Sequence, residues 1–179
     1  DCFMYFNEDL VLDVRLNELN PYIDKFVIVE SNFTHSGEKK DFNFDIRKYQ
    51  KFANKIIYLK IDQKPKNLIQ INGEDSEDDI KNKQVENALI LENFQRNYIY
   101  KGLENFDDND FILVSDIDEI PNLSLIDLNL HKNSIVLFKQ YFFHYKFNLF
   151  LDNFYFFGSK GCIKKKLISP QWLRNVKGK

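Results

Sequence analysis

Three acidic residues directly follow an apolar segment in the second half of the chain. Residues 111–114 are all apolar, and Asp116, Asp118 and Glu119 come after them, ahead of Pro121. In an extended backbone Asp116 and Asp118 would point to the same side, and convergent carboxylates favour a hard divalent cation such as Mg²⁺ or Mn²⁺. Pro121 prevents the strand from continuing in a regular ladder. The pattern predicts a metal site at the carboxyl end of a strand, where open α/β sheets bind ligands.

A cation would also relieve the repulsion among these acids. Carboxylates held close together cost electrostatic free energy unless a cation or a proton neutralises them. Such a cation would bridge the phosphates of a nucleotide-sugar and stabilise the leaving diphosphate during sugar transfer. Transfer would also need a carboxylate as general base on the acceptor hydroxyl, and Glu119 and Glu30 are the candidates. The alternative is ordinary turn chemistry, because acids after a strand often cap a helix or fill a turn.

Alternating apolar patterns indicate the elements that would position these acids. Runs rich in β-branched and aromatic residues are typical of buried strands, and apolar residues three or four positions apart are typical of helices. Leu12, Leu16 and Leu19 predict one helix, which ends at Asn20-Pro21. The predicted strands are residues 2–6, 26–29, 56–61, 111–114 and 135–138.

The longest predicted helix covers residues 79–103. Val85, Leu89 and Tyr98 would form its core-facing stripe. Two shorter helices are predicted, one over residues 46–53 and one that starts at Ser169-Pro170. The order of strands and helices is typical of an α/β sheet with helical crossovers and one core.

Composition excludes several classes of function. The 179 residues carry 25 basic and 27 acidic side chains, and this near balance argues against a general electrostatic grip on nucleic acid. The two cysteines make neither a disulfide framework nor a four-ligand zinc site. No stretch approaches the roughly 20 apolar residues of a membrane span. Without a visible anchor, we expect a cytoplasmic protein.

Residues 141–157 are unusually rich in aromatic side chains. Such rings either pack in a core or line a cleft in which they stack on the apolar faces of a sugar. Core packing is the favoured interpretation for any single ring.

Five separated blocks of the sequence resemble glycosyltransferase family 17, which includes enzymes that add bisecting N-acetylglucosamine. The blocks are residues 1–8, 12–19, 27–37, 94–97 and 115–121. The resemblance implies a GT-A-type, Rossmann-like fold, with a mostly parallel central sheet flanked by helices. It also implies an inverting transfer of a sugar, N-acetylglucosamine in the best-known members, from a UDP-sugar to a glycan acceptor. A divalent metal, Mn²⁺ or Mg²⁺, is expected as cofactor.

The resemblance also assigns residues to the site. Asp116 and Asp118 match the Asp-x-Asp pattern that binds the metal and the diphosphate, and Glu119 belongs to the same block. The arginine-asparagine pair of the fourth block would contact a phosphate or orient the acidic loop. The residues expected to border the nucleotide are Asn7, Glu8, Ser31, Asn32, Arg96 and Asn97.

Family members continue into a Gly-Gly-Trp-His-like segment that this sequence does not contain. We therefore expect residues 1–179 to be a single GT-A-like domain without its C-terminal segment. Two other functions stay open. One is a haloacid-dehalogenase-like phosphatase, in which an Asp-x-Asp also follows an apolar strand and the first Asp is the nucleophile. The other is a non-catalytic relative that binds a nucleotide or a sugar.

Overall fold

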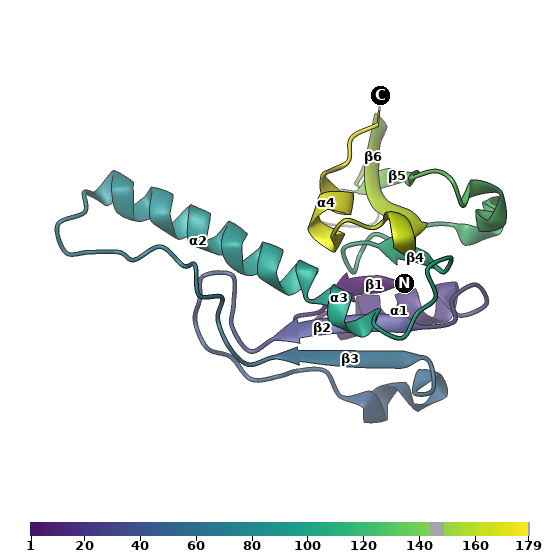
Figure 1. Cartoon of the computed structure of the whole chain (residues 1–179), viewed down its shortest axis with the longest axis horizontal. Helices are drawn as coiled ribbons and strands as arrows, with labels where there is room; N and C mark the ends of the chain where they lie inside the picture. Colours follow the sequence, from purple (N-terminus) through teal and green to yellow (C-terminus); the bar gives the residue numbers. More distant parts are fainter. Residues whose placement is uncertain (144–148, 179) are drawn as a thin grey trace.

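Six strands form one mixed sheet in the computed structural model, which describes residues 1–143 and 149–178. The strands are β1 (Cys2–Met4), β2 (Phe26–Ser31), β3 (Ile56–Ile61), β4 (Phe111–Val114), β5 (Val136–Phe143) and β6 (Phe150–Ile163). Their order across the sheet is β3-β2-β1-β4-β6-β5 (Figure 1). The first four strands are parallel, and β6 runs antiparallel to both of its neighbours. The prediction of a mostly parallel α/β sheet is confirmed.

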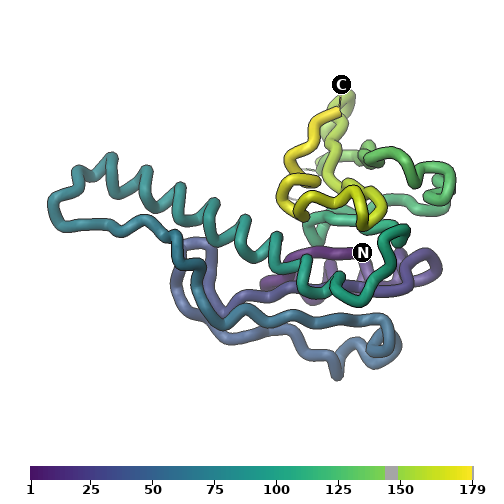
Figure 2. Tube along the Cα trace, viewed as in Figure 1, coloured from purple at the N-terminus to yellow at the C-terminus, as the bar shows by residue number. Residues whose placement is uncertain are grey.

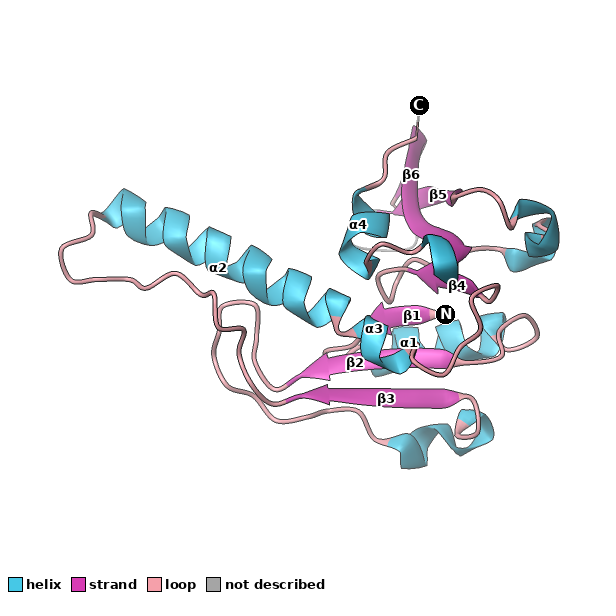
Figure 3. Cartoon of the chain, viewed as in Figure 1, coloured by secondary structure: helices cyan, strands magenta, loops and turns pink. Residues whose placement is uncertain are grey.

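Helices cover both faces of this sheet (Figure 3). They are α1 (Asp9–Leu19), α2 (Glu77–Asn97), α3 (Ile99–Gly102) and α4 (Pro170–Asn175), together with the short 3₁₀ helices η1 (Ile46–Phe52), η2 (Leu123–Leu125), η3 (Leu128–His131) and η4 (Lys164–Lys166). α1 and η1 pack on one face, whereas α3, α4 and the C-terminal end of α2 pack on the other. None of the helices in the described ranges has the length and apolar character that a membrane span needs.

Helical spacing places the leucines of α1 in the core as predicted. Leu12, Leu16 and Leu19 are each at most 1% exposed, because residues three and four apart lie on the same side of a helix. They share a core with Phe3 and Phe26 of the sheet. With helices on both faces, all six residues of β2 are buried. This covered part of the sheet is the rigid base of the site.

The β5–β6 hairpin is built differently. The first eight residues of β6 are exposed and the last six are buried. Phe154, Tyr155 and Phe157 are 43–47% exposed, so the expected core packing is wrong for these rings. The predicted strand at 135–138 starts one residue before β5 and ends well before it does, and β6 was not predicted. Residues 144–148 of the aromatic segment lie outside the described residues.

The N-terminal half of α2 projects away from the sheet (Figure 1). Ser76 and Asp79 form a capping box that starts the helix. The segment between β3 and α2 lies alongside the helix (Figure 2). The side chain of Asn87 forms two hydrogen bonds with the backbone of Ile69, one to its carbonyl oxygen and one from its amide. Val85 and Leu89 are 61% and 53% exposed, so the predicted core-facing stripe is wrong at these positions. The sheet does not extend beneath this half of the helix.

Candidate active site

A cleft of about 820 Å³ lies at the carboxyl ends of β1, β2 and β4, against α2. Its volume is within the range of roughly 300–1,000 Å³ that is usual for small-molecule sites. Five predicted site residues line it, and they come from four separate segments of the chain. They are Glu8, Ser31, Arg96, Asp116 and Asp118. The strand ends bring them together as the sequence pattern predicts.

A buried arginine from α1 holds the backbone of the acidic loop. Arg15 is fully buried, and its Nη1 donates to the carbonyl oxygens of Asp116, Ile117 and Glu119 at 3.2, 3.1 and 2.9 Å. Its Nε and Nη2 donate to the carboxylate of Asp1 at 2.9 and 2.7 Å. Burial lowers the pKa of Arg15 to about 10, which leaves it cationic at neutral pH. Arg15 therefore determines the shape of the loop.

Two other arginines neutralise the carboxylates of this loop. Arg96 Nη2 lies 3.0 Å from one oxygen of Asp116, and Arg174 Nη2 lies 2.9 Å from the other. Arg174 also holds both oxygens of Glu119, at 2.6 and 2.9 Å. Burial opposes the charge of Arg174, but its hydrogen bond to Glu119 and the nearby acids raise its pKa overall. Arginine thus relieves the repulsion for which the sequence suggested a metal.

Asp118 differs from the other two acids. Its side chain is exposed, lines the cleft and makes no hydrogen bond or ion pair with any residue in 1–143 or 149–178. Glu119 is buried beside it and accepts a hydrogen bond from the backbone amide of Asp116 at 2.7 Å. Carboxylate oxygens are the donors that Mg²⁺ and Mn²⁺ prefer, so the loop fits such an ion chemically. However, the described residues hold no preformed group of three metal-ligating side chains.

Arg96 and Asn97 connect the cleft to α4. Arg96 is buried, pairs with Glu92 at 2.8 Å and donates to the side chain of Gln171. Its Nε has no hydrogen-bond partner within the described part of the chain. Asn97 is exposed, does not line the cleft and accepts a hydrogen bond from the backbone of Gln171 at 3.0 Å. Asn97 therefore has a structural role and does not reach the cleft. Arg96 both orients the acidic loop and faces the cleft.

Glu30 is fully buried and does not line the cleft, although its partner Lys40 does. Its oxygens accept hydrogen bonds from Lys40 Nζ, the backbone amides of Asn43 and Phe44, and the hydroxyl of Tyr58, at 2.6–3.1 Å. These four donors occupy both oxygens of the Glu30 carboxylate. Glu30 therefore anchors the segment after β2, and nothing in its surroundings favours the predicted role of general base.

Of the remaining predicted residues, two line the cleft and two do not. The Ser31 hydroxyl accepts a hydrogen bond from the amide of Phe33 at the cleft wall. Asn32 is buried outside the cleft lining, and its Oδ1 has no partner among the described residues. Glu8 precedes α1 and accepts hydrogen bonds from two backbone amides, one of them from Asn7 at 3.0 Å. Asn7 is exposed and does not line the cleft.

Sequence reasoning missed Arg174 and Gly158. Arg174 lies on α4, and no local pattern around it indicates an acidic partner far back in the chain. Its Nη1 also donates to the carbonyl oxygen of Gly158. A Cβ at Gly158 would lie 2.5 Å from Cδ of Glu119, so only glycine allows β6 to pass so close to the acid. The sequence shows the glycine, but it does not show that Gly158 packs against Glu119.

Comparisons with known proteins point to one family. The family model for Glycosyltransferase family 17 matches residues 1–160. Over 119 residues, the chain is 29% identical to the β-1,4-mannosyl-glycoprotein 4-β-N-acetylglucosaminyltransferases of Homo sapiens and Rattus norvegicus, and 28% identical to that of Mus musculus. Each match covers 62% of this chain but 19% of the relative, so the chain spans about a fifth of these proteins. No solved structure matches significantly.

Proposed function

The chain belongs to glycosyltransferase family 17, and on this basis we propose that it transfers a sugar from a UDP-sugar to a glycan acceptor. The observation that carries the proposal is the cleft at the strand ends, where Asp116, Asp118 and Arg96 meet. Family membership favours transfer over the phosphatase alternative. Both oxygens of Asp116, the nucleophile in that alternative, are also held by arginines.

We further propose that the donor sugar is N-acetylglucosamine, because the curated relatives bear that activity in their names. Inversion at the anomeric carbon and a GT-A-type fold follow from the same likeness. Residues 1–179 would supply the nucleotide and metal part of the site.

Asp116 and Asp118 would hold the divalent cation. When bound, it would supply positive charge against the diphosphate that leaves during transfer. Arg96 lies in the cleft wall with a cationic group that complements the donor phosphates, and its contacts to Glu92 and Gln171 restrict its orientation. Ser31 and Glu8 lie at the carboxyl ends of the neighbouring strands β2 and β1, where the nucleoside would contact the protein.

The general base would be Glu119. Neither Glu119 nor Glu30 lines the cleft itself, but Glu119 belongs to the acidic loop and lies directly beside Asp116, whereas Glu30 follows β2 and holds four hydrogen-bond donors. Because Glu119 is paired with Arg174, it accepts a proton only after that pair opens.

Titration of UDP with and without Mn²⁺ tests the proposal. Asp118→Asn removes an exposed carboxylate that supports no other described side chain, and it should weaken Mn²⁺-dependent UDP binding at least about tenfold. The double variant Asp116→Ala/Asp118→Ala should abolish the Mn²⁺ dependence. The matched control is Asp78→Asn, because the Asp78 side chain is 93% exposed on the projecting end of α2. UDP binding that is independent of Mn²⁺ and unchanged in both site variants contradicts the proposed site.

A further inference from the structure

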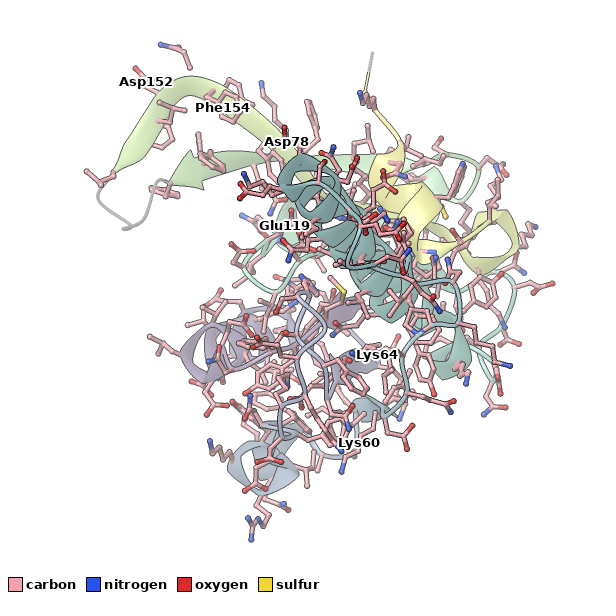
Figure 4. All side chains as sticks on the ribbon, turned by 90° about the vertical axis from the view of Figure 1, so that its left-hand side faces the viewer. Lys60, Lys64, Asp78, Glu119, Asp152 and Phe154 are labelled. Atoms are coloured by element: carbon pink, nitrogen blue, oxygen red, sulfur yellow. The ribbon has the colours of Figure 1, made fainter. Side chains whose placement is uncertain are left out.

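Arg174 covers the side of the acidic loop that a cation would need. Its Nη1 and Nη2 contact both oxygens of Glu119, and Nη2 also contacts the oxygen of Asp116 that Arg96 leaves open. Figure 4 labels Glu119 among the side chains beside the near end of α2, and it labels Asp152 and Phe154 on the hairpin above. Three of the four carboxylate oxygens of Asp116 and Glu119 therefore bond to one guanidinium group.

This contact is well shielded from solvent. The side chains of Arg174 and Glu119 are 11% and 10% exposed, and that of Asp116 is 40% exposed. A two-pronged arginine–carboxylate contact in such surroundings is among the stronger ion pairs. A guanidinium group and a divalent ion cannot occupy the same position between these oxygens, since each needs direct contact with them.

Groups other than the Arg174 side chain hold both ends of α4. The backbone at the end of α4 is held by Lys160, whose Nζ donates to the carbonyl oxygens of Arg174 and Val176. Ser169 caps the other end through the amide of Trp172 at 3.0 Å. Rotation of the Arg174 side chain alone would therefore free the two carboxylates, while Asp118 already faces the cleft.

We propose that Arg174 sets the cation affinity of the acidic loop by competing with the divalent ion for Asp116. The inference rests on the proposed function, because it concerns the cation of that same site. Asp118 would hold the ion from the cleft, and Asp116 would join it only where Arg174 withdraws, which would also release Glu119 for its proposed role as base. Arg96 stays on Asp116 and preserves part of the neutralisation.

Binding of Mn²⁺ alone, measured by the electron paramagnetic resonance signal of the free ion, tests the competition. Arg174→Gln removes the charge but keeps polar contacts, and it should bind Mn²⁺ about tenfold more tightly than the wild type, as expected for a nearby unit charge in a partly screened site. Arg174→Lys keeps the charge but loses the two-pronged contact, and its affinity should lie between them. Arg47→Gln is the control, because Arg47 pairs with Asp45 at the surface and has a side chain that is 83% exposed.

The direction in which the Mn²⁺ affinity changes shows whether Arg174 competes with the ion or supports the loop that binds it. If Arg174 merely orders the loop, both Arg174 variants bind Mn²⁺ more weakly, and the proposal is overturned. If the glutamine variant does not fold by circular dichroism, the lysine variant decides, since an affinity equal to or below that of the wild type contradicts competition. Failure of every protein to bind Mn²⁺, with or without UDP, overturns the proposed metal site as well. Normal Mn²⁺-dependent UDP binding with no gain in the variants overturns this inference alone.

Discussion

The parallel part of the sheet and the β5–β6 hairpin contain similar residues in opposite surroundings. Every residue of β2 is buried between helices, whereas the outer eight residues of β6 are exposed although most of them are apolar. The last six residues of β6 return to the buried sheet beside β4. The change occurs at Gly158, next to Glu119. The acidic loop therefore lies at the border between the two regions.

Covering layers, rather than apolar composition, cause this difference. α1 covers one face of the parallel strands, and α2, α3 and α4 cover the other, but no described helix packs on the outer hairpin. The site accordingly takes its shape from the parallel part. Arg15 holds the backbone of the loop from that side, and Arg174 holds its side chains from the other.

The largest expected effect tests whether the loop depends on the parallel part. Arg15→Met would leave Asp1 buried without its partner and would remove one donor from each of three carbonyl oxygens. We expect the free energy of unfolding to fall by about 3–5 kcal/mol, measured by urea denaturation. Arg47→Met, at an exposed pair, should change it by about 0.5 kcal/mol or less. Equal effects would mean that the contacts of Arg15 support the fold no more than an exposed ion pair does.

A matched pair of leucines compares the regions directly. Leu16 is fully buried in α1, and Leu151 is 38% exposed in the hairpin. Leu16→Ala should cost about 2–5 kcal/mol because it leaves a cavity in the core. Leu151→Ala should cost about 1 kcal/mol or less, since little apolar surface returns to water. Thermal and urea denaturation measure both values, and a similar loss for Leu151 would mean that the hairpin is covered in solution.

The smallest effect concerns the alkaline limit of the parallel part. The pKa of Tyr58 is raised, first by burial and then by its hydrogen bond to Glu30. A raised folded pKa stabilises the protein fully below the unfolded value of about 10, and this stability is lost as the pH rises further. Tyr58→Phe should cost about 1 kcal/mol at neutral pH and should lose less stability above about pH 10. Urea denaturation at neutral pH and above about pH 10 measures the free energy of unfolding under both conditions. The control is Tyr22→Phe, because Tyr22 is exposed. An unchanged alkaline loss would show that other groups control it.

Much of the parallel part could be predicted from local patterns. The strands at 56–61 and 111–114 have the predicted limits, because each is a short apolar run bounded by polar residues. Ser169 and Pro170 start α4 as predicted, since a serine cap and a proline in the first turn are both local signals. The acidic strand end also lies in the cleft, as the rule for α/β sheets predicts.

The errors arise where tertiary contacts decide. Val85 and Leu89 have helical spacing, but their part of α2 extends past the sheet and has no core to face. The partner of Asp116 and Glu119 on α4 follows from chain packing and from no nearby pattern. Glu30 looks like an active-site acid by position after a strand, yet the fold surrounds it with donors. Sequence spacing predicts the position of a residue on its helix or strand, but not the residues that its side chain contacts in the folded protein.

Gly158 links the evolution of two distant positions. Because a methyl group there would overlap Glu119 and would lie 2.8 Å from Gln140 Oε1, a larger residue at 158 requires both side chains to shorten or to move. Selection on the acid therefore acts on the glycine as well. A catalogue of single substitutions would record position 158 as intolerant for a reason that resides at positions 119 and 140.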